Sequence, residues 1–294
     1  MCLTVLAFSL SFPVKNDTPS PVAQVRAFLF YAPMQELDFF RDFSVSNPIL
    51  MQGDCLELMK SIPDGSVDMI LCDLPYGTTA CKWDTIIPFE PLWEQYKRVI
   101  KPNGAIVLFA SQPFTTTLIS GNILNYKYSW VWDKGTGANF QQVKRQPMRY
   151  TEDICVFSYN AHNYYPIIEK REKAKDYTNC KTLRSKNENI NHFHSDESKL
   201  NVLRTEKYPS NIISISSQIA ECNNLNRIHP TQKPVALCEY LIKTYTNEGE
   251  TVLDNCMGSG TTGVAAKNLS RNFIGIEKDE KYFQIASDRI NGQT

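Results

Sequence analysis

The sequence has no excess of charge of either sign and no long apolar run. Lys and Arg together number 31, as do Asp and Glu, so the formal net charge is zero. This balance argues against a histone-like or strongly basic binder, although it leaves room for a local basic groove. Because no run of 18 apolar residues occurs, we expect no membrane-spanning helix.

Paired cysteine and metal-ligand motifs are also missing. The nine cysteines include no C-x-x-C pair, and the chain is too long for a disulfide scaffold, so we interpret them as reduced thiols of an intracellular protein. We expect a cytoplasmic location, or a nuclear one if the source is eukaryotic. His192-Phe193-His194 comes nearest to a metal cluster, but it lacks the spacing of a zinc site, and we expect no metal.

Regular patterning begins only at Ile49, and residues 1–46 are expected to form an N-terminal extension of unknown role. Residues 160–226 are dominated by Lys, Asn, Ser and Glu without periodicity, so we interpret them as an insert outside the sheet. Apolar runs predict strands at residues 49–54, 67–72, 105–109, 126–132, 153–159, 251–253 and 273–276. Amphipathic patterns predict helices at 55–61, 90–101 and 264–269, one that follows Pro234 and ends at 247–249, and one from 279.

The stretch Asp73-Leu74-Pro75-Tyr76 follows the apolar run at 67–72. Pro75 stiffens the chain just past the strand end, and Gly77 lets it turn away. A carboxylate, a backbone carbonyl and an aromatic ring are thereby presented at the carboxyl end of a strand, where open α/β sheets bind their ligands. The set suits a flat ligand with an amino group at its edge, although a Pro turn with a Tyr packed at its rim explains these four residues equally well.

A basic segment lies between the predicted strands at 126–132 and 153–159. It contains Lys134, Lys144, Arg145 and Arg149, and acidic residues oppose them only at its ends. Such a segment is suited to phosphate contact. A solvated loop is the alternative interpretation.

A glycine loop, Gly258-x-Gly260-x-x-Gly263, stands between a predicted strand and a helix, and Glu277 ends the next strand. This matches the dinucleotide fingerprint, while the lack of a Lys after Gly260 excludes a P-loop. Asp254 sits at the strand end before the loop, where a carboxylate is poorly matched to a pyrophosphate. A ligand with an adenosine ribose and a positively charged amino-acid tail, such as S-adenosylmethionine, suits it better.

Together the motifs resemble those of amino-methylating DNA methyltransferases of the permuted, β type, a family of adenine-specific modification enzymes from phages and bacteria. The resemblance covers residues 47–291 and keeps the family's order, with the catalytic motif first and the cofactor loop last. It departs at Leu74, where the family usually has Pro, and at Cys256 or Met257, which replaces the usual Phe. It is carried by Gly53-Asp54, Asp73-Leu74-Pro75-Tyr76, His229-Pro230-Thr231-Gln232-Lys233-Pro234 and Asp254 through Thr262.

The resemblance implies an α/β fold, a Rossmann-like methyltransferase sheet that is mostly parallel with one reversed strand. The catalytic half, residues 47–159, and the cofactor-binding half, residues 227–294, would form one sheet. The stretch 160–226 would be the target-recognition insert.

The resemblance also implies S-adenosylmethionine as cofactor and double-stranded DNA as substrate. Asp73 and the Leu74 carbonyl would hold the N6 amino group of a flipped-out adenine, next to Pro75, and Tyr76 would stack on the base. Asp54 would contact the cofactor adenine, Glu277 its ribose hydroxyls and Asp254 the methionine end or the nearby loop. The remaining cofactor-binding residues would be Lys233, near the methionine carboxylate, and Gly258, Gly260, Thr261 and Thr262 of the loop.

Several alternatives stay open at this level. Cytosine-N4 is the second choice of target, although a Ser in place of Asp73 is more often associated with it. A nicotinamide-dependent oxidoreductase would use the same glycine loop but leaves the Asp73 motif unexplained. A non-catalytic nucleic-acid-binding module, an RNA substrate and a homodimer are further alternatives.

Overall fold

The computed structural model describes residues 44–45, 47–77, 85–176, 203–217 and 232–292. Nearly all of the predicted N-terminal extension, the His192-Phe193-His194 sequence and His229-Pro230-Thr231 lie outside these residues. Within them, no helix combines the length and apolar character needed to cross a bilayer. All that follows concerns the unit formed by residues 41–294.

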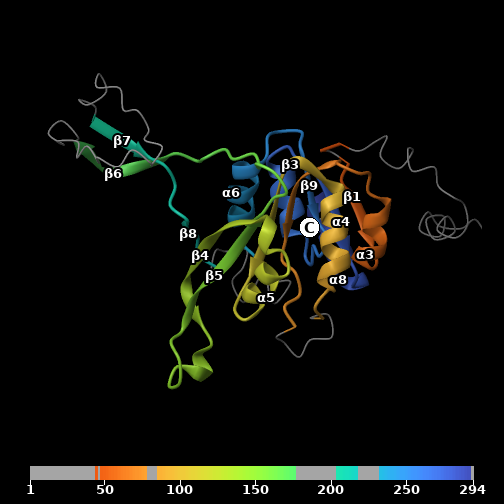
Figure 1. The fold of residues 1–294 in the computed structure, drawn as a ribbon, viewed down its shortest axis with the longest axis horizontal. Helices are drawn as coiled ribbons and strands as arrows, with labels where there is room; N and C mark the ends of the chain where they lie inside the picture. The colour runs from red at the N-terminus through yellow and green to blue at the C-terminus, as the bar shows by residue number, and fades with distance from the viewer. Residues whose placement is uncertain (1–43, 46, 78–84, 177–202, 218–231, 293–294) are drawn as a thin grey trace, which may run out of the picture. The chain divides into compact units, whose positions relative to one another are not determined.

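A single eight-stranded sheet organises the described part of this unit (Figure 1). Its first five strands are mutually parallel, and β5 runs against both of its neighbours. The mostly parallel sheet with one reversed strand is therefore confirmed. In spatial order the strands are β1 (Ile49–Gln52), β10 (Asn272–Glu277), β9 (Thr251–Asp254), β2 (Val67–Cys72), β3 (Ile100–Ala110), β5 (Arg149–Phe157), β4 (Tyr126–Ala138) and β8 (Ile212–Ser214).

Helices pack against both faces of the sheet. The helices α6 (Val235–Tyr245), α7 (Thr261–Asn268) and α8 (Glu280–Asn291) share one buried cluster with Met69 and Leu71 of β2. Ile70 and Cys72, which alternate with them along β2, are equally buried and face the other side of the sheet, because successive side chains of a strand point to opposite faces. The remaining helical elements are α3 (Cys55–Leu58), α4 (Phe89–Val99), α5 (Phe114–Ser120) and the 3₁₀ turns η1 (Met59–Ser61), η2 (Ile123–Asn125) and η3 (Phe140–Gln142).

Several element boundaries differ from the prediction. Helix α4 ends at Val99 instead of Lys101, because Ile100 is already extended and pairs with Val67. Pro102-Asn103-Gly104 is then an irregularity within β3, where a shift of register occurs, and a Cβ on Gly104 would meet Ile100 Cγ1 at 2.6 Å. Glycine inside a strand often marks such a bulge. The predicted helix at 55–61 divides into α3 and η1, and α7 begins three residues before the predicted start.

The predicted insert contributes to the main sheet, contrary to expectation. β8 pairs in parallel with β4 through Ile212, Ile213 and Ser214. By contrast, β6 (Glu169–Asp176) and β7 (Leu203–Lys207) form a separate antiparallel pair. The rest of 160–226 is outside the described residues or lacks regular structure, so the predicted domain boundaries stay a prediction.

The two sequence halves meet at the centre of the sheet, where β2 pairs with β9. Both strands run in the same direction, so their carboxyl ends lie at the same edge. Asp73 follows β2 directly, and Asp254 is the last residue of β9. The fold therefore brings the two predicted motifs together, although about 180 residues separate them in the sequence.

Candidate active site

A pocket of about 850 Å³ opens at the carboxyl edge of the sheet. It joins residues of the Asp73 motif and of the glycine loop in one cavity. Of the residues predicted from the sequence, it is lined by Asp54, Asp73, Leu74, Pro75, Tyr76, Lys134, Lys233, Asp254, Gly258, Thr261, Thr262 and Glu277. Gly260, Lys144, Arg145 and Arg149 do not line it.

Both oxygens of the Asp73 carboxylate are hydrogen-bonded. The Tyr76 hydroxyl donates to Oδ1 at 2.8 Å, and the Lys233 ammonium donates to Oδ2 at 2.7 Å. Burial, together with the nearby Asp73 charge, raises the pKa of Tyr76 well above its usual value, so its hydroxyl stays protonated and remains a donor. The carboxylate is thereby held in one orientation from two sides.

Lys233 also connects Asp73 to a second carboxylate. Its ammonium lies 3.5 Å from Glu152 Oε2, and Glu152 Oε1 in turn accepts from Lys134 at 3.1 Å. Burial opposes the charge of Lys233, but Asp73 and Glu152 outweigh it and raise its pKa. Burial likewise opposes ionisation of Glu152, yet Lys233 and Lys134 hold the pKa of this carboxyl below its usual value. The result is a charged chain of alternating sign along the pocket wall.

The sequence predicts no role for Glu152, which is one of the acidic residues at the ends of the basic segment. The residue lies on β5, and its partner Lys233 precedes α6, so only the folded sheet brings them together. The resemblance implies that Lys233 lies near the cofactor, whereas its observed contacts are with the two carboxylates and with the face of Phe109, at 5.1 Å from the ring centroid.

The Tyr76 ring packs against a second aromatic ring, which in turn contacts a third. It stacks on Phe114 of α5, with ring centroids 4.9 Å apart and an interplanar angle of 24°. Phe114 also contacts Phe89 at 5.9 Å. These contacts fix the plane of a ring that lines the pocket, as a stacking platform for a flat ligand requires.

The glycine loop is held in place by Glu277. Its Oε2 accepts from the Gly258 amide at 2.8 Å, and its Oε1 accepts from the Asp279 amide at 2.9 Å. Gly258 and Gly260 have φ angles of 52° and 79°, which side chains with a Cβ rarely adopt. A Cβ on Gly260 would approach Ala286 of α8 at 3.0 Å. Gly260 therefore shapes the turn and packs against a helix, while Gly258 faces the pocket.

One polar atom at the start of α7 has no partner. Thr261 Oγ1 is buried and makes no hydrogen bond within the part of the chain that is described. The Thr261 side chain lines the pocket, at the positive end of a helix dipole. A buried hydroxyl without a partner is costly, so this atom marks a place where a bound ligand would supply the hydrogen bond.

The two other predicted aspartates have structural contacts of their own. Asp54 caps α3 by accepting from the Leu56 amide at 3.0 Å, and Lys278 lies 3.1 Å from its Oδ2 and lowers its pKa. Asp254 is buried, and this burial raises its pKa to about 7 although its Oδ1 accepts from the Cys256 amide. Asp254 is thus positioned to stabilise the turn that leads into the glycine loop.

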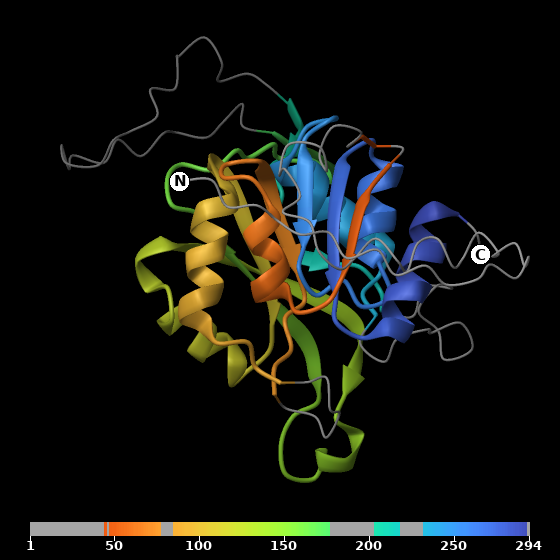
Figure 2. The ribbon, with the colours of Figure 1, turned by 90° about the vertical axis from the view of Figure 1, so that its right-hand side faces the viewer.

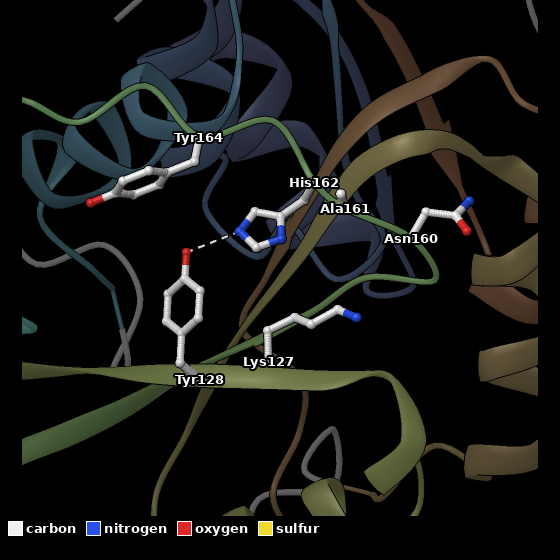
Figure 3. A pocket seen from close by; sticks show the side chains of 6 residues that line it. All are labelled: Lys127, Tyr128, Asn160, Ala161, His162 and Tyr164. Carbon is white, nitrogen blue, oxygen red and sulfur yellow. Dashed lines mark hydrogen bonds between the residues drawn. The ribbon is translucent and has the colours of Figure 1, made fainter. Parts of the chain in front are cut away.

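A second hollow, of about 690 Å³, lies near the amino end of β4 and hence at the opposite edge of the sheet (Figure 3). The Tyr128 hydroxyl there is 3.0 Å from His162 Nε2 and 2.9 Å from the Tyr245 hydroxyl. Burial and the nearby Lys127 lower the pKa of His162. Because these polar groups bond to one another and none belongs to a predicted motif, we assign the chemistry to the first pocket.

Comparison with known proteins agrees with this assignment. A family model described as DNA methylase (N6_N4_Mtase) matches residues 67–288. The Type II methyltransferase M.HpaI of Haemophilus parainfluenzae is 27% identical over 260 residues, which cover 83% of this chain and 74% of M.HpaI. The Type II methyltransferase M.HinfI of Haemophilus influenzae is 28% identical over 278 residues, which cover 82% of this chain and 67% of M.HinfI.

Solved structures show the same similarity. The M1.HpyAVI–SAM complex is 26% identical, with a TM-score of 0.53, over 82% of this chain and 98% of that one. The cytosine-N4-specific PvuII DNA methyltransferase has a TM-score of 0.56 over 84% of this chain and 88% of that one, but at 16% identity it shows the fold alone. Because the family model matches most of the chain, and because the Asp73 motif and the glycine loop meet in one pocket, this chain belongs to the DNA methylase family.

Proposed function

We propose that this DNA methyltransferase transfers the methyl group of S-adenosylmethionine to the exocyclic N6 amino group of adenine in double-stranded DNA. The observation that carries the proposal is the single pocket that joins Asp73 and Tyr76 with Gly258, Thr261 and Glu277. Its volume, about 850 Å³, is in the range of cofactor sites and leaves room for a base next to the cofactor.

The residues present fit S-adenosylmethionine. Thr261 Oγ1, which has no hydrogen-bond partner among the described residues, offers a hydrogen bond beside the loop. Glu277 uses one acceptor position of each oxygen for a backbone amide, and the remaining lone pairs can accept the two ribose hydroxyls. Asp54 is half exposed at the pocket wall and would meet the cofactor adenine. When bound, the cofactor supplies an electrophilic methyl carbon on a sulfonium centre.

The Asp73 motif would activate the target amine. The nitrogen lone pair of an aromatic amine is delocalised into the ring, which makes it a weak nucleophile. If the amino protons donate to the Asp73 carboxylate and the Leu74 carbonyl, the nitrogen is drawn towards a tetrahedral geometry and its lone pair turns to the methyl carbon. The developing positive charge on nitrogen is stabilised by the same carboxylate, which Lys233 and Tyr76 hold in place.

Contact with the DNA backbone would fall to the exposed basic residues of the β4–β5 hairpin. Lys144, Arg145 and Arg149 are all exposed. Lys134 is different, because its side chain is only 12% exposed and its ammonium pairs with Glu152. We therefore propose phosphate contacts for the first three residues and a supporting role in the pocket for Lys134.

Nucleoside analysis tests the proposal. The full-length protein would be incubated with unmethylated duplex DNA and S-adenosylmethionine carrying a deuterated methyl group, and the DNA digested for mass spectrometry. We expect labelled N6-methyl-2′-deoxyadenosine, with at least about a hundredfold less from Asp73→Ala. Labelled N4-methyl-2′-deoxycytidine would identify the alternative target, and no labelled nucleoside in any duplex DNA would refute the proposed reaction.

A further inference from the structure

The β4–β5 hairpin extends from the pocket to an exposed tip. Figures 1 and 2 both show it projecting beyond the body of the sheet. The tip contains η3, and all of residues 140–147 are exposed. Phe140, the first residue of this run, is 68% exposed, and Val143 on the same turn is 49% exposed. Large apolar side chains displayed together at the end of a hairpin are a feature of binding surfaces.

The tip is an ordered turn. The Gln142 amide donates to the Asn139 carbonyl at 3.0 Å, and the Arg145 amide donates to the Gln142 carbonyl at 2.8 Å. Asn139 adopts a left-handed conformation with φ of 60°, and its side chain accepts from the Arg149 amide at 3.0 Å, which ties the two strands together. The backbone therefore presents the Phe140 ring to solvent from a defined position.

The charge around Phe140 matches a nucleic acid. No Asp or Glu occurs between Asp133 and Glu152. Three basic side chains at or next to the tip, those of Lys144, Arg145 and Arg149, are exposed. An apolar ring within a group of cations fits a partner that offers both phosphates and stacked bases.

The distance from the tip to the pocket is short. Thr136, Gly137 and Ala138 of β4 line the pocket. Phe140 follows Ala138 by two residues, so their Cα atoms lie at most about 7 Å apart. This corresponds to roughly two base-pair steps of 3.4 Å, so a duplex whose target base enters the pocket would pass beside the Phe140 ring.

From these observations we propose that Phe140 inserts into the base stack of DNA next to the target and occupies the space that the target base leaves when it rotates into the pocket. The inference rests on the proposed function. A base inside a duplex must leave the stack to reach the pocket, and an inserted apolar side chain replaces the lost stacking. Phe140 would thus act in opening the duplex, and the methyl-transfer step would not depend on it.

The test compares duplexes that differ only in how firmly the target base is paired. The methylated site would first be mapped on plasmid DNA treated with the wild-type enzyme. Oligonucleotide duplexes carrying this site would then be prepared with the target base correctly paired or placed opposite a mismatch. Wild-type protein, Phe140→Ala, Phe140→Trp and the control Gln141→Ala, an exposed polar neighbour, would be assayed on both.

We expect Phe140→Ala to lower kcat/KM at least tenfold on the paired duplex and less than threefold on the mismatched one, because the mismatch already weakens the pairing. Phe140→Trp and Gln141→Ala should stay within threefold of wild type on both. If Phe140→Ala lowered kcat/KM equally on the two duplexes, or did not lower it on the paired one, the proposed insertion of Phe140 would be overturned. If the wild-type protein methylated neither duplex, the proposed function would be refuted, and the proposed insertion of Phe140 with it.

Discussion

Replacing Lys233 with Met should both destabilise the protein and reduce its activity. The Lys233 side chain is 10% exposed, and its partners Asp73 and Glu152 are 23% and 19% exposed. Methionine keeps most of the volume but leaves two carboxylates facing each other without the cation between them. Removing one partner of a buried pair costs about 3–5 kcal/mol, and we expect about 3 kcal/mol because solvent still reaches these groups.

The variant should therefore unfold at a lower temperature. For a chain of this size, each kcal/mol shifts Tm by about 2–4 °C, so we expect a decrease of about 6–12 °C in a thermal scan. Lys60→Met is the matched control. Lys60 lies 2.8 Å from Glu57, but the two side chains are 59% and 70% exposed, and such surface pairs contribute about 1 kcal/mol or less. The same scan compares the two variants directly.

The decrease in Tm caused by Lys233→Met should become smaller at low pH. Burial opposes ionisation of Glu152, but Lys233 and Lys134 hold its pKa below the ordinary value of 4.5. A carboxyl whose pKa is lowered by folding adds stability above its unfolded pKa and loses this contribution as the pH falls through its folded pKa. The Lys233→Met variant has less of this stabilisation to lose. The difference in Tm between wild type and variant should therefore narrow below about pH 4.5.

Activity gives a second readout. Without Lys233, the Asp73 carboxylate keeps, among the described residues, only the Tyr76 hydrogen bond, and we expect kcat to fall about 10–100-fold, less than for loss of the carboxylate itself. The charged chain described above would be refuted if Lys233→Met cost no more stability than Lys60→Met. It would also be refuted if Lys233→Met and Glu152→Gln had additive effects in a double-mutant cycle, since groups in direct contact should be coupled.

Three further variants separate the proposed roles. Asp73→Ala should lower methyl transfer by about 10²–10³-fold or more, with cofactor affinity within a few-fold by calorimetry, and retention of a tenth of the activity would contradict its role. Glu277→Ala should weaken S-adenosylmethionine binding about 10–100-fold and leave DNA binding without cofactor unchanged. A variant that binds the cofactor normally but binds DNA differently would show that the cofactor site is not at Glu277. Changing Lys144 and Arg145 to Ala should reduce DNA affinity and lower the slope of log K against log salt concentration by up to about two units. An unchanged slope would show that neither residue contacts a phosphate.

The elements that the sequence predicts best are those with strong local patterns. The strand Val67–Cys72 is buried at all six positions and follows a turn at Gly65, so its bounds are correct to the residue. Helix α6 has an apolar face and begins right after Pro234. In these two elements the local pattern and the folded structure agree.

The elements that the sequence misses depend on distant partners. Pro102-Asn103-Gly104 has the local pattern of a helix end, yet Ile100 before it pairs with Val67. Only three residues of β8 pair with β4, too few to produce a periodic pattern. Similarly, the hydrogen bond from Lys233 to Asp73 spans 160 positions of the sequence. The two motifs are recognisable separately, but their direct contact is a property of the folded sheet.

Because β9 lies between β2 and β10, the sheet cannot be completed until late in the synthesis of the chain. When residues up to 159 have left the ribosome, β2 has β3 as a neighbour, but its other side awaits residues 251–254. An apolar strand with an open edge is prone to pair with other chains. A nascent chain of this protein therefore carries an aggregation-prone edge, together with an Asp73 motif that still lacks the glycine loop. Chaperone demand should be greatest in this interval, and cleavage of the chain before β9 should yield an insoluble fragment.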